Sequence, residues 1–499
     1  MSMKKNEPNT QSQERTPSEE HQVRIEKVAA MKEAGLKAWP EFKPINATTK
    51  DVHDEFQDDQ ESRVYEVAGR LVSLRGHGKT MFGNIQDPSG TIQIYVRKDR
   101  LGDALFDQFD RFADVGDVLW VKGHSFKTKM GEITIKASEV TLLSKSLHPL
   151  PEKFHGLADV ETKYRQRYLD LISNKESRER FIKRSLIIRE IRNYLNEHDC
   201  IEVETPMLHP IPGGAVARPF ITHHNALSSD FYLRIAPELY LKRLVVGGME
   251  RVFEINRSFR NEGISTRHNP EFTMVEIYIA HHDYHWMMDF SQAMIQRVVK
   301  AVSDDMTVSF GDHQIDLSKP FERISMRDAV IKYAGISDKE LSDTSIDATL
   351  KKHDVSVAEN ASWGLKLSEL FDQLVESKLI QPTFITHFPV EISPLAKRDP
   401  EHPDFVSRFE MFVAGMELAN AFNELNDPFD QAERFKAQAA AKDAGDAEAH
   451  HYDAEYVTAL EYAMPPTVGY GMGIDRLTML LTNTTSIKDV ILFPTLKKK

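Results

Sequence analysis

Apolar and polar residues alternate in five short segments between residues 65 and 143. Alternation with a period of two places neighbouring side chains on opposite faces of an extended chain, so each segment is predicted to be a strand with one buried face. The Asp-Pro-Ser-Gly sequence at 87–90 is typical of a hairpin turn. The predicted strands are YEVAGRLVSL (65–74), TMFGNIQD (80–87), TIQIYV (91–96), VLWVKGHSF (118–126) and EITIKASEVTLL (132–143).

Five short strands in this space are typical of a small closed β-barrel such as an OB-fold, with an SH3-like barrel as the competing interpretation. Upstream, the apolar positions from Val23 to about Lys37 predict an amphipathic helix, and the polar residues 1–22 predict a disordered tail. Pro149-Leu150-Pro151 predicts a boundary, because closely spaced prolines suit neither a helix nor a central strand. We therefore expect an N-terminal domain at 23–150 and a second domain at 151–499.

The second domain mixes helical and strand patterns. Helices are expected at about 160–198, two strands around a loop at 252–280, and a largely helical insertion at about 320–405. Asp427-Pro428 is typical of a helix N-cap followed by proline at the first helical position, and the helix should continue to about Asp443.

Composition narrows the class of protein without fixing its function. The chain has 499 residues, 41% hydrophobic and 28% charged, as expected of a globular protein with more than one domain. No apolar run approaches the ~20 residues of a membrane helix, and we expect no secretory signal. The single cysteine, Cys200, excludes an intrachain disulfide, favours a buried structural thiol and suits the reducing cytoplasm. The net charge of −13 disfavours non-specific nucleic-acid binding but allows a local basic groove.

Candidate chemistry gathers at 251–280. Arginines offer paired donors for phosphate, aromatic rings offer stacking surfaces, and buried carboxylates can bind an amine. A solvated hairpin with surface ion pairs is the alternative, which the alternating apolar residues Phe253, Ile255 and Phe259 disfavour. One strand face carries Glu254, Asn256, Ser258 and Arg260, the loop carries Glu262, Arg267 and His268, and the second strand carries Phe272, Met274, Glu276 and Tyr278.

Three segments together resemble a known family. FRNEG followed by RHNPEF, within about 251–280, resembles motif 2 of the class II aminoacyl-tRNA synthetases. VGYGMGIDRLTMLL, within about 468–483, resembles motif 3, and HDCIEVETPMLHP, within about 190–210, resembles motif 1, which ends at Pro206. The resemblance implies an α+β protein: a five-stranded OB-fold barrel, then a catalytic domain on a mostly antiparallel sheet flanked by helices. It also implies a homodimer formed through motif 1.

The resemblance implies an ATP site without a Walker loop. Arg260 and Arg476 would be the catalytic arginines: Arg260 would hold the α-phosphate, and Arg476 would sandwich the adenine with Phe272. Glu262 would read the adenine amino group, and Arg267 and His268 would reach the outer phosphates. The glycines of motif 3, Gly469, Gly471 and Gly473, would let the backbone approach a ligand closely.

The resemblance also places two metal-binding acids, Glu410 and Glu417, in RFEMFVAGMELANAFNELND at 408–427. Carboxylates of this kind suit Mg²⁺ bound together with ATP, and more than one ion is expected. From the residues alone, two acids exposed at a strand end are an equal alternative.

Other positions resemble those of the lysine-specific members, of the bacterial type with an N-terminal OB-fold. A lysine pocket needs a carboxylate facing the ε-ammonium, because burying an unpaired charge costs several kcal/mol. APELYLK at 236–242 and NELND at 423–427 carry this part of the resemblance. Glu424 would pair with the ε-ammonium beside Tyr278 and Glu276, Glu238 and the Gly214 backbone would hold the α-amino group, Asn420 and Arg260 would bind the carboxylate, and Phe422 would complete the pocket.

The barrel would then read RNA. Alternation directs Met81, Ile85, Ile92, Ile94, Val96, Ile133 and Ile135 inward, and Phe82, Gln93 and Glu132 outward. An exposed ring beside polar groups can stack on a base and bond its edge, although a stray surface aromatic is common. Phe82, Gln93 and Glu132 match the family positions that bind the central anticodon uridine.

The expected reaction joins L-lysine to ATP, releases pyrophosphate, and transfers lysine from the adenylate to tRNA(Lys), leaving AMP. The nearest rivals, the aspartate and asparagine enzymes, carry a QSPQ-like run where this chain has IAPE at 235–238. A non-catalytic RNA-binding protein is a further rival, as is a truncated paralogue that modifies a translation factor and lacks the barrel. A P-loop is disfavoured, because Gly78-Lys79-Thr80 joins two strands and Ser73 stands where a glycine is required.

Overall fold

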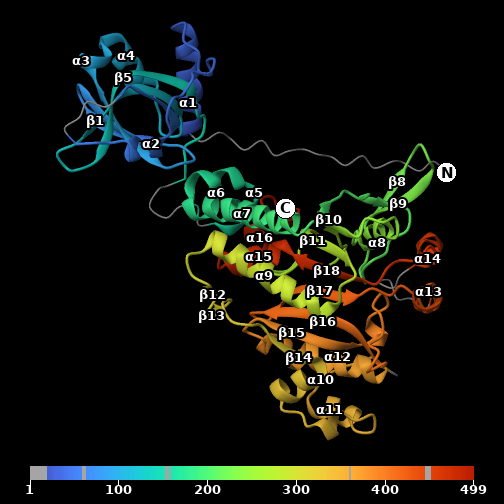
Figure 1. Ribbon diagram of the computed structural model, residues 1–499. Helices are drawn as coiled ribbons and strands as arrows, with labels where there is room; N and C mark the ends of the chain where they lie inside the picture. Colours follow the sequence, from blue (N-terminus) through green and yellow to red (C-terminus); the bar gives the residue numbers. More distant parts are fainter. Residues whose placement is uncertain are drawn as a thin grey trace. The chain divides into compact units, whose positions relative to one another are not determined.

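The chain forms two compact units, Met1–Gly156 and Leu157–Lys499. The computed structural model describes residues 19–58, 63–151, 157, 159–358, 361–443 and 451–498 (Figure 1). The expected tail lies outside the described residues as far as residue 18, and from Glu19 the chain is already helical. The first helix thus begins before the expected start at Val23 and ends at Glu33.

The first unit is a closed five-stranded barrel with strand order β1-β2-β3-β5-β4. β3 and β5 pair in parallel and the other neighbours pair antiparallel. All five predicted strands are confirmed, and the helices between β3 and β4 are additional. The elements are α1 (Glu19–Glu33), α2 (Thr49–Asp54), β1 (Tyr65–His77), β2 (Thr80–Gln86), β3 (Thr91–Arg97), α3 (Lys98–Leu101), α4 (Asp103–Phe112), β4 (Val118–Lys127) and β5 (Ile133–Ser144).

Alternation closes the barrel over an apolar interior. Val67, Ile85 and Ile94 are fully buried there, as the period-two pattern requires. At the predicted hairpin turn, Oδ1 of Asp87 accepts hydrogen bonds from the backbone N–H groups of Ser89 and Gly90. The sequence Gly78-Lys79 is likewise the turn between β1 and β2, which agrees with the exclusion of a P-loop.

The second unit is built on an eight-stranded sheet of order β14-β15-β16-β17-β18-β11-β10-β6. Only the outermost pairs, β14 with β15 and β10 with β6, are parallel. The predicted mostly antiparallel sheet and the α+β class are confirmed. The strands are β6 (Ile201–Glu202), β10 (Arg251–Phe259), β11 (Glu271–Ala280), β14 (Glu322–Ser325), β15 (Thr383–Pro389), β16 (Phe405–Val413), β17 (Met416–Asn423) and β18 (Thr467–Gly473).

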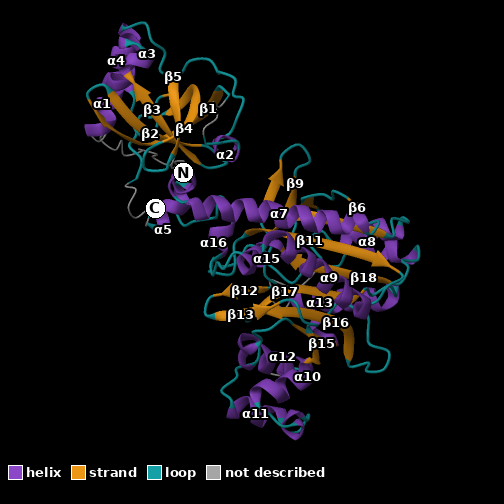
Figure 2. Cartoon of the chain, turned by 60° about the vertical axis from the view of Figure 1, so that its left-hand side comes forward, coloured by secondary structure: helices purple, strands orange, loops and turns teal. Residues whose placement is uncertain are grey.

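Helices pack on this sheet and on its edges (Figure 2). One face is covered by α7, α9 and α15, whose apolar residues join Val275, Ile277 and Ile279 of β11 in one core. α13 begins at Pro428 and ends at Asp443, as predicted, with the Asp427 carboxylate accepting from the Phe429 N–H. The helices are α5 (Val160–Arg165), α6 (Arg167–Ser173), α7 (Lys175–Glu197), α8 (Glu238–Val246), α9 (Tyr284–Val302), α13 (Pro428–Asp443), α14 (Ala454–Glu461), α15 (Ile474–Leu481) and α16 (Ile487–Val490).

The largely helical insertion predicted at about 320–405 is narrower in the structure: its α-helices lie between Met326 and Leu374, with one strand before them and one after them. β14 and β15 lie in this segment and belong to the central sheet, because their apolar residues Ile324, Ile385 and Phe388 pack beneath the inserted helices. The helical part contains α10 (Met326–Ala329), α11 (Ile346–Lys352), α12 (Trp363–Leu374) and short 3₁₀ and π segments.

Smaller pieces complete the second unit. β7 (Leu208–His209), β8 (Ile221–His224) and β9 (Ser229–Leu233) form a three-stranded sheet, and β12 (Thr307–Phe310) pairs with β13 (His313–Asp316). Cys200 is buried, and burial raises the pKa of its thiol to about 11, which suits an inert structural role. Across the described ranges, no helix has both the length and the apolar character needed to span a membrane.

Candidate active site

A cavity of about 420 Å³ opens on the face of the sheet opposite to α9 and α15. Every residue that the sequence analysis assigned to ATP, lysine or Mg²⁺ lines this cavity, although these residues come from widely separated segments. They are Gly214, Glu238, Arg260, Glu262, Arg267, His268, Phe272, Glu276, Tyr278, Glu410, Glu417, Asn420, Phe422, Glu424, Gly473 and Arg476.

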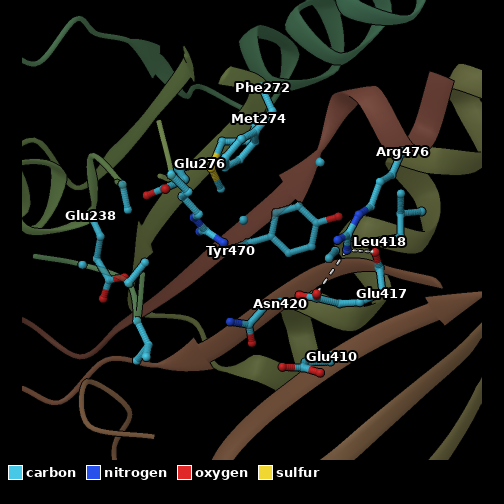
Figure 3. Close-up of a pocket in the computed structure, with 18 of the residues that line it drawn as sticks. Glu238, Phe272, Met274, Glu276, Glu410, Glu417, Leu418, Asn420, Tyr470 and Arg476 are labelled. Carbon is cyan, nitrogen blue, oxygen red and sulfur yellow. Dashed lines mark hydrogen bonds and ion pairs between the residues drawn. The ribbon is translucent and has the colours of Figure 1, made fainter. Parts of the chain in front are cut away.

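The cavity has two chemically different ends. Figure 3 shows Glu238 and Glu276 at one end, and Arg476 with Glu417 at the other. We call them the acidic end, formed by Glu238, Glu276, Tyr278 and Glu424, and the arginine end, formed by Arg260, Arg267, His268 and Arg476. Asn420 and Glu410 lie between them, on the neighbouring strands β17 and β16.

Strand register explains how the acidic end is assembled. β11 faces β18 with Glu276 opposite Gly471 and Tyr278 opposite Gly469. A Cβ atom at Gly469 would lie 2.0 Å from Oε1 of Glu424 and 2.7 Å from Cε1 of Tyr278. The glycine therefore makes room for two pocket side chains, in addition to the expected close approach of its backbone to a ligand.

Glu424 is the most enclosed acid of the site. It follows the end of β17, is 1% exposed, and lines the cavity. Its Oε2 forms an ion pair with Nζ of Lys242, and its Oε1 has no hydrogen-bond partner among the described residues. A buried carboxylate in the wall of a cavity, with one oxygen that lacks a partner, is a site for a cationic ligand.

Burial also controls the second acid, Glu276. Desolvation, and then repulsion from Glu238, raise the pKa of Glu276 to about 8. The Tyr278 hydroxyl donates a 3.1 Å hydrogen bond to Oε2 of Glu276, and burial raises the pKa of Tyr278 well above its ordinary value. Glu276 and Tyr278 thus add polar atoms with little fixed charge near neutral pH.

Arg260 dominates the arginine end. It lies just after β10, with its guanidinium carbon 5.1 Å from the centre of the Phe272 ring. Its Nε has no hydrogen-bond partner, and no ion pair holds it, within the described part of the chain. Desolvation lowers the pKa of Arg260. An anion in the cavity would replace the hydrogen bonds that the guanidinium loses when it is removed from water.

Three further residues form the arginine end. Nη1 of Arg476 donates to the carbonyl oxygen of Glu417 at 2.5 Å and to its carboxylate at 3.2 Å, while Nη2 lies 3.3 Å from Nε2 of His268. Arg267 donates to the carbonyl oxygen of Gly415 at 2.8 Å. Desolvation and Arg476 lower the pKa of His268, which leaves this ring neutral near pH 7.

Glu410 and Glu417 form a carboxylate pair on β16 and β17. Burial, with repulsion from Glu417 and Asp372, raises the pKa of Glu410 to about 8. Desolvation and neighbouring acids raise the pKa of Asp372 to about 7. Acids that raise the pKa of a neighbouring acid in this way fit a divalent cation, which would relieve their repulsion. The described residues contain no group of three or more metal-ligating side chains, and Mg²⁺ usually completes its shell with water and phosphate oxygens.

Sequence patterns did not identify two charged residues that contact the site. Arg408 donates to Oδ1 of Asn420 at 3.0 Å and to Oε1 of Glu410 at 2.5 Å, so it fixes both side chains. Its position two residues before Glu410, on the same face of β16, was a readable signal. Lys242 contacts Glu238 at 2.6 Å as well as Glu424. Its position four residues after Glu238 indicated a helical pair but not the contact with β17.

The barrel presents the second candidate surface. Phe82 is half-buried and contacts Tyr95 with tilted rings whose centres are 4.7 Å apart, and the centre of the Phe126 ring lies 5.8 Å from that of Tyr95. Glu132 is exposed, as expected. Gln93 faces the same side but is only 4% exposed, because its amide donates to Glu132 and its carbonyl accepts from Thr134. Alternation predicted the direction of Gln93 but not its burial.

Known protein families match the two units of the chain separately. The family described as tRNA synthetases class II (D, K and N) matches residues 159–497, and the family described as OB-fold nucleic acid binding domain matches residues 65–143. A lysine–tRNA ligase of Staphylococcus haemolyticus is 50% identical over 97% of this chain and 99% of its own length. Those of Syntrophomonas wolfei and Mannheimia succiniciproducens are each 52% identical, over 97% and 96% of this chain. The chain belongs to the class II tRNA synthetases, in the D, K and N group, with an N-terminal OB-fold domain.

Proposed function

We propose that this chain is a lysine–tRNA ligase, which activates L-lysine with ATP and transfers it to tRNA(Lys). One observation carries the choice of amino acid: buried carboxylates line one end of the cavity, and Oε1 of Glu424 has no hydrogen-bond partner among the described residues. A carboxylate in this setting favours an amine-tipped side chain and disfavours an acidic one, because like charges in a buried pocket repel strongly. The relatives that match almost the whole chain are lysine–tRNA ligases.

Lysine would lie along the cavity with its ε-ammonium on Glu424, beside Tyr278 and Glu276. Glu238 and the Gly214 backbone would hold the α-amino group, and Phe422 would complete the wall. Asn420 and Arg260 would bind the α-carboxylate near the arginine end. The site would thereby contact both amino groups and the reacting carboxylate, which positions the carboxylate for attack on the α-phosphate.

ATP would occupy the arginine end. Phe272 and Arg476 would enclose the adenine, Glu262 would read its amino group, and Gly473 would line the site. Arg267 and His268 would contact the outer phosphates. In the first step the lysine carboxylate attacks the α-phosphate and pyrophosphate leaves, and Arg260 stabilises the charge that develops there. No side chain needs to form a covalent bond with either substrate.

Glu410 and Glu417 would hold Mg²⁺, in more than one ion, together with ATP. When bound, the metal supplies positive charge against the phosphate oxygens. Arg408 orients Glu410, and Arg476 is tied to Glu417, so the protein fixes both carboxylates before substrates arrive.

In the second step the 3′-terminal hydroxyl of tRNA attacks the adenylate, while the barrel would hold the anticodon through Phe82, Gln93 and Glu132. We further propose a homodimer formed through residues 190–210, where Ile201, Met207 and Leu208 are exposed apolar residues. A reaction that consumes ATP and charges tRNA suits the cytoplasm.

ATP–pyrophosphate exchange tests the proposal directly. Exchange should depend on lysine and should be at least ~100-fold weaker with aspartate, asparagine or arginine at the same concentration. The main rival is an aspartate or asparagine enzyme of the same family. Exchange that is driven by aspartate or asparagine, and not by lysine, would replace the proposal with that rival.

A further inference from the structure

Lys242 is an ammonium buried behind the wall of the amino-acid pocket. It belongs to α8, its side chain is 0% exposed, and it is not among the residues that line the cavity. Its Nζ lies 2.6 Å from Oε1 of Glu238 and forms an ion pair with Oε2 of Glu424. Glu238 and Glu424 do line the cavity, so Lys242 contacts both acids from behind the cavity wall.

The two acids come from different elements. Glu238 is the first residue of α8, and Glu424 follows the last residue of β17. Lys242 therefore ties the helix to the strand at the point where both present carboxylates to the cavity. The rings of Phe422 and Tyr456, with centres 5.5 and 5.8 Å from Nζ, enclose the ammonium and keep water away from it.

The fold alone gives little reason for a charge at this position. A buried ion pair commonly stabilises a protein no more than apolar residues of the same volume would, because desolvation offsets the attraction. Two acids and one ammonium carry a net charge of −1, so the cluster still attracts a cationic ligand. Without Lys242, two buried carboxylates would face each other across the pocket, and at least one would take up a proton.

We propose that Lys242 is a positioning and specificity residue: it keeps Glu238 and Glu424 ionised and correctly placed to receive the amino groups of the substrate. The inference rests on the proposed function and adds to it a counter-charge that never touches the substrate. Recognition of the substrate lysine thus depends on Lys242, which pairs with the same two carboxylates from inside the protein.

The electrostatic surroundings set the expected pH dependence. Burial raises the pKa of both Glu238 and Glu424, and the Lys242 ammonium opposes that shift. The other titratable or charged groups facing the cluster are Glu276 and Tyr278 on β11, Arg408 on β16 and Tyr456 on α14. Removing Lys242 should therefore leave acids that bind an amine only after they ionise at higher pH.

Lys242→Gln is the sharpest variant, because its amide can still donate hydrogen bonds but carries no charge. Lys242→Met removes both properties. Arg243→Met is the matched control: it removes a cation from the next residue of α8, where Arg243 pairs with Asp453 at 2.9 Å, away from the acid cluster. The measurements are KM for lysine, KM for ATP and kcat in ATP–pyrophosphate exchange from about pH 6 to about pH 9, with thermal unfolding of each variant.

We expect both Lys242 variants to raise KM for lysine by ~10- to 100-fold near pH 7, with KM for ATP within ~3-fold of wild type. In both, KM for lysine should fall with rising pH more steeply than in wild type, and Arg243→Met should match wild type. A Lys242→Gln enzyme with wild-type KM for lysine would overturn the charge role. Unfolding of both variants, or equal losses of ATP and lysine affinity, would reduce Lys242 to a structural residue. Absence of lysine-dependent exchange in the wild-type protein would instead refute the proposed function.

Discussion

The cavity and the outer face of the barrel are both lined by side chains from alternating positions of a strand, but these side chains are buried to different extents. In both, residues at alternating positions of a strand project from one face: Glu276 and Tyr278 on β11, and Phe82 and Asn84 on β2. In the cavity these side chains are almost fully buried, with Glu276 4% and Tyr278 3% exposed. On the barrel, Phe82 and Asn84 remain half-exposed.

Depth determines the energy of recognition. In the cavity, removing one charged group leaves its partner buried and unpaired, which costs ~3–5 kcal/mol. On the barrel, the lost interaction is mainly stacking, worth ~1–3 kcal/mol per base, and water can replace the remaining polar contacts. A single substitution in the cavity should therefore cause a large loss of activity, and a single substitution on the barrel a smaller loss.

The largest effect is expected for Arg260→Ala. This arginine is already short of partners, and its loss would remove the cation nearest to the proposed α-phosphate. Adenylate formation, measured by ATP–pyrophosphate exchange, should fall by ~1,000-fold or more. Arg257→Ala is the control, on the strand that precedes Arg260, because the Arg257 side chain approaches Glu271 at 3.8 Å. Near-normal exchange by Arg260→Ala would remove this residue from the mechanism.

Glu424→Gln should come next. The change preserves shape but removes the charge that is proposed to face the ε-ammonium, so KM for lysine should rise by ~100-fold while KM for ATP stays within ~3-fold. Lys242 keeps Glu238 as a partner, so the protein should still fold, which thermal unfolding checks. The control is Glu455→Gln, an exposed acid on α14. If the KM values for lysine and ATP rose together, Glu424 would support the structure of the whole cavity, and the acidic end would not be specific for lysine.

Local patterns predicted much of both sites. Period-two alternation correctly paired Glu276 with Tyr278 on one face of β11, and it gave all five barrel strands. The proline after Asp427 gave the first residue of α13. These features depend on residues within one element, where spacing in sequence translates directly into direction in space. The assignment to a lysine pocket came from resemblance, not from spacing.

Long-range contacts were beyond such patterns. Lys242 meets Glu424 only after helix and strand pack together, and no local spacing relates them. The same applies to Gly469, whose missing side chain leaves space for Glu424 and Tyr278. Gln93 illustrates a milder limit: its direction was predicted, but its burial depends on Glu132 and Thr134 from another part of the barrel.

On the barrel, Phe82→Ala should impair tRNA charging without impairing amino-acid activation in the cavity. It removes the half-exposed ring that contacts Tyr95, so kcat/KM for tRNA charging should fall by ~10- to 100-fold. ATP–pyrophosphate exchange needs no anticodon and should stay at the wild-type rate. Phe42→Ala is the matched control, because Phe42 is 87% exposed in the same unit and lies outside the barrel strands. A parallel loss of exchange would mean that the barrel and the cavity cannot be treated as separate sites.

The smallest effect is expected for Thr134→Val, which tests whether depth also matters within the barrel. Thr134 is fully buried and donates a 2.9 Å hydrogen bond to the carbonyl oxygen of Gln93. Valine keeps the volume but leaves Gln93 held only by Glu132, so charging should fall by ~3- to 10-fold, as for one lost neutral hydrogen bond. Thr141→Val on the same strand should have no effect. A loss as large as that of Phe82→Ala would show that the fixed orientation of Gln93 matters as much as stacking, and that this face, like the cavity, recognises its ligand through buried polar groups.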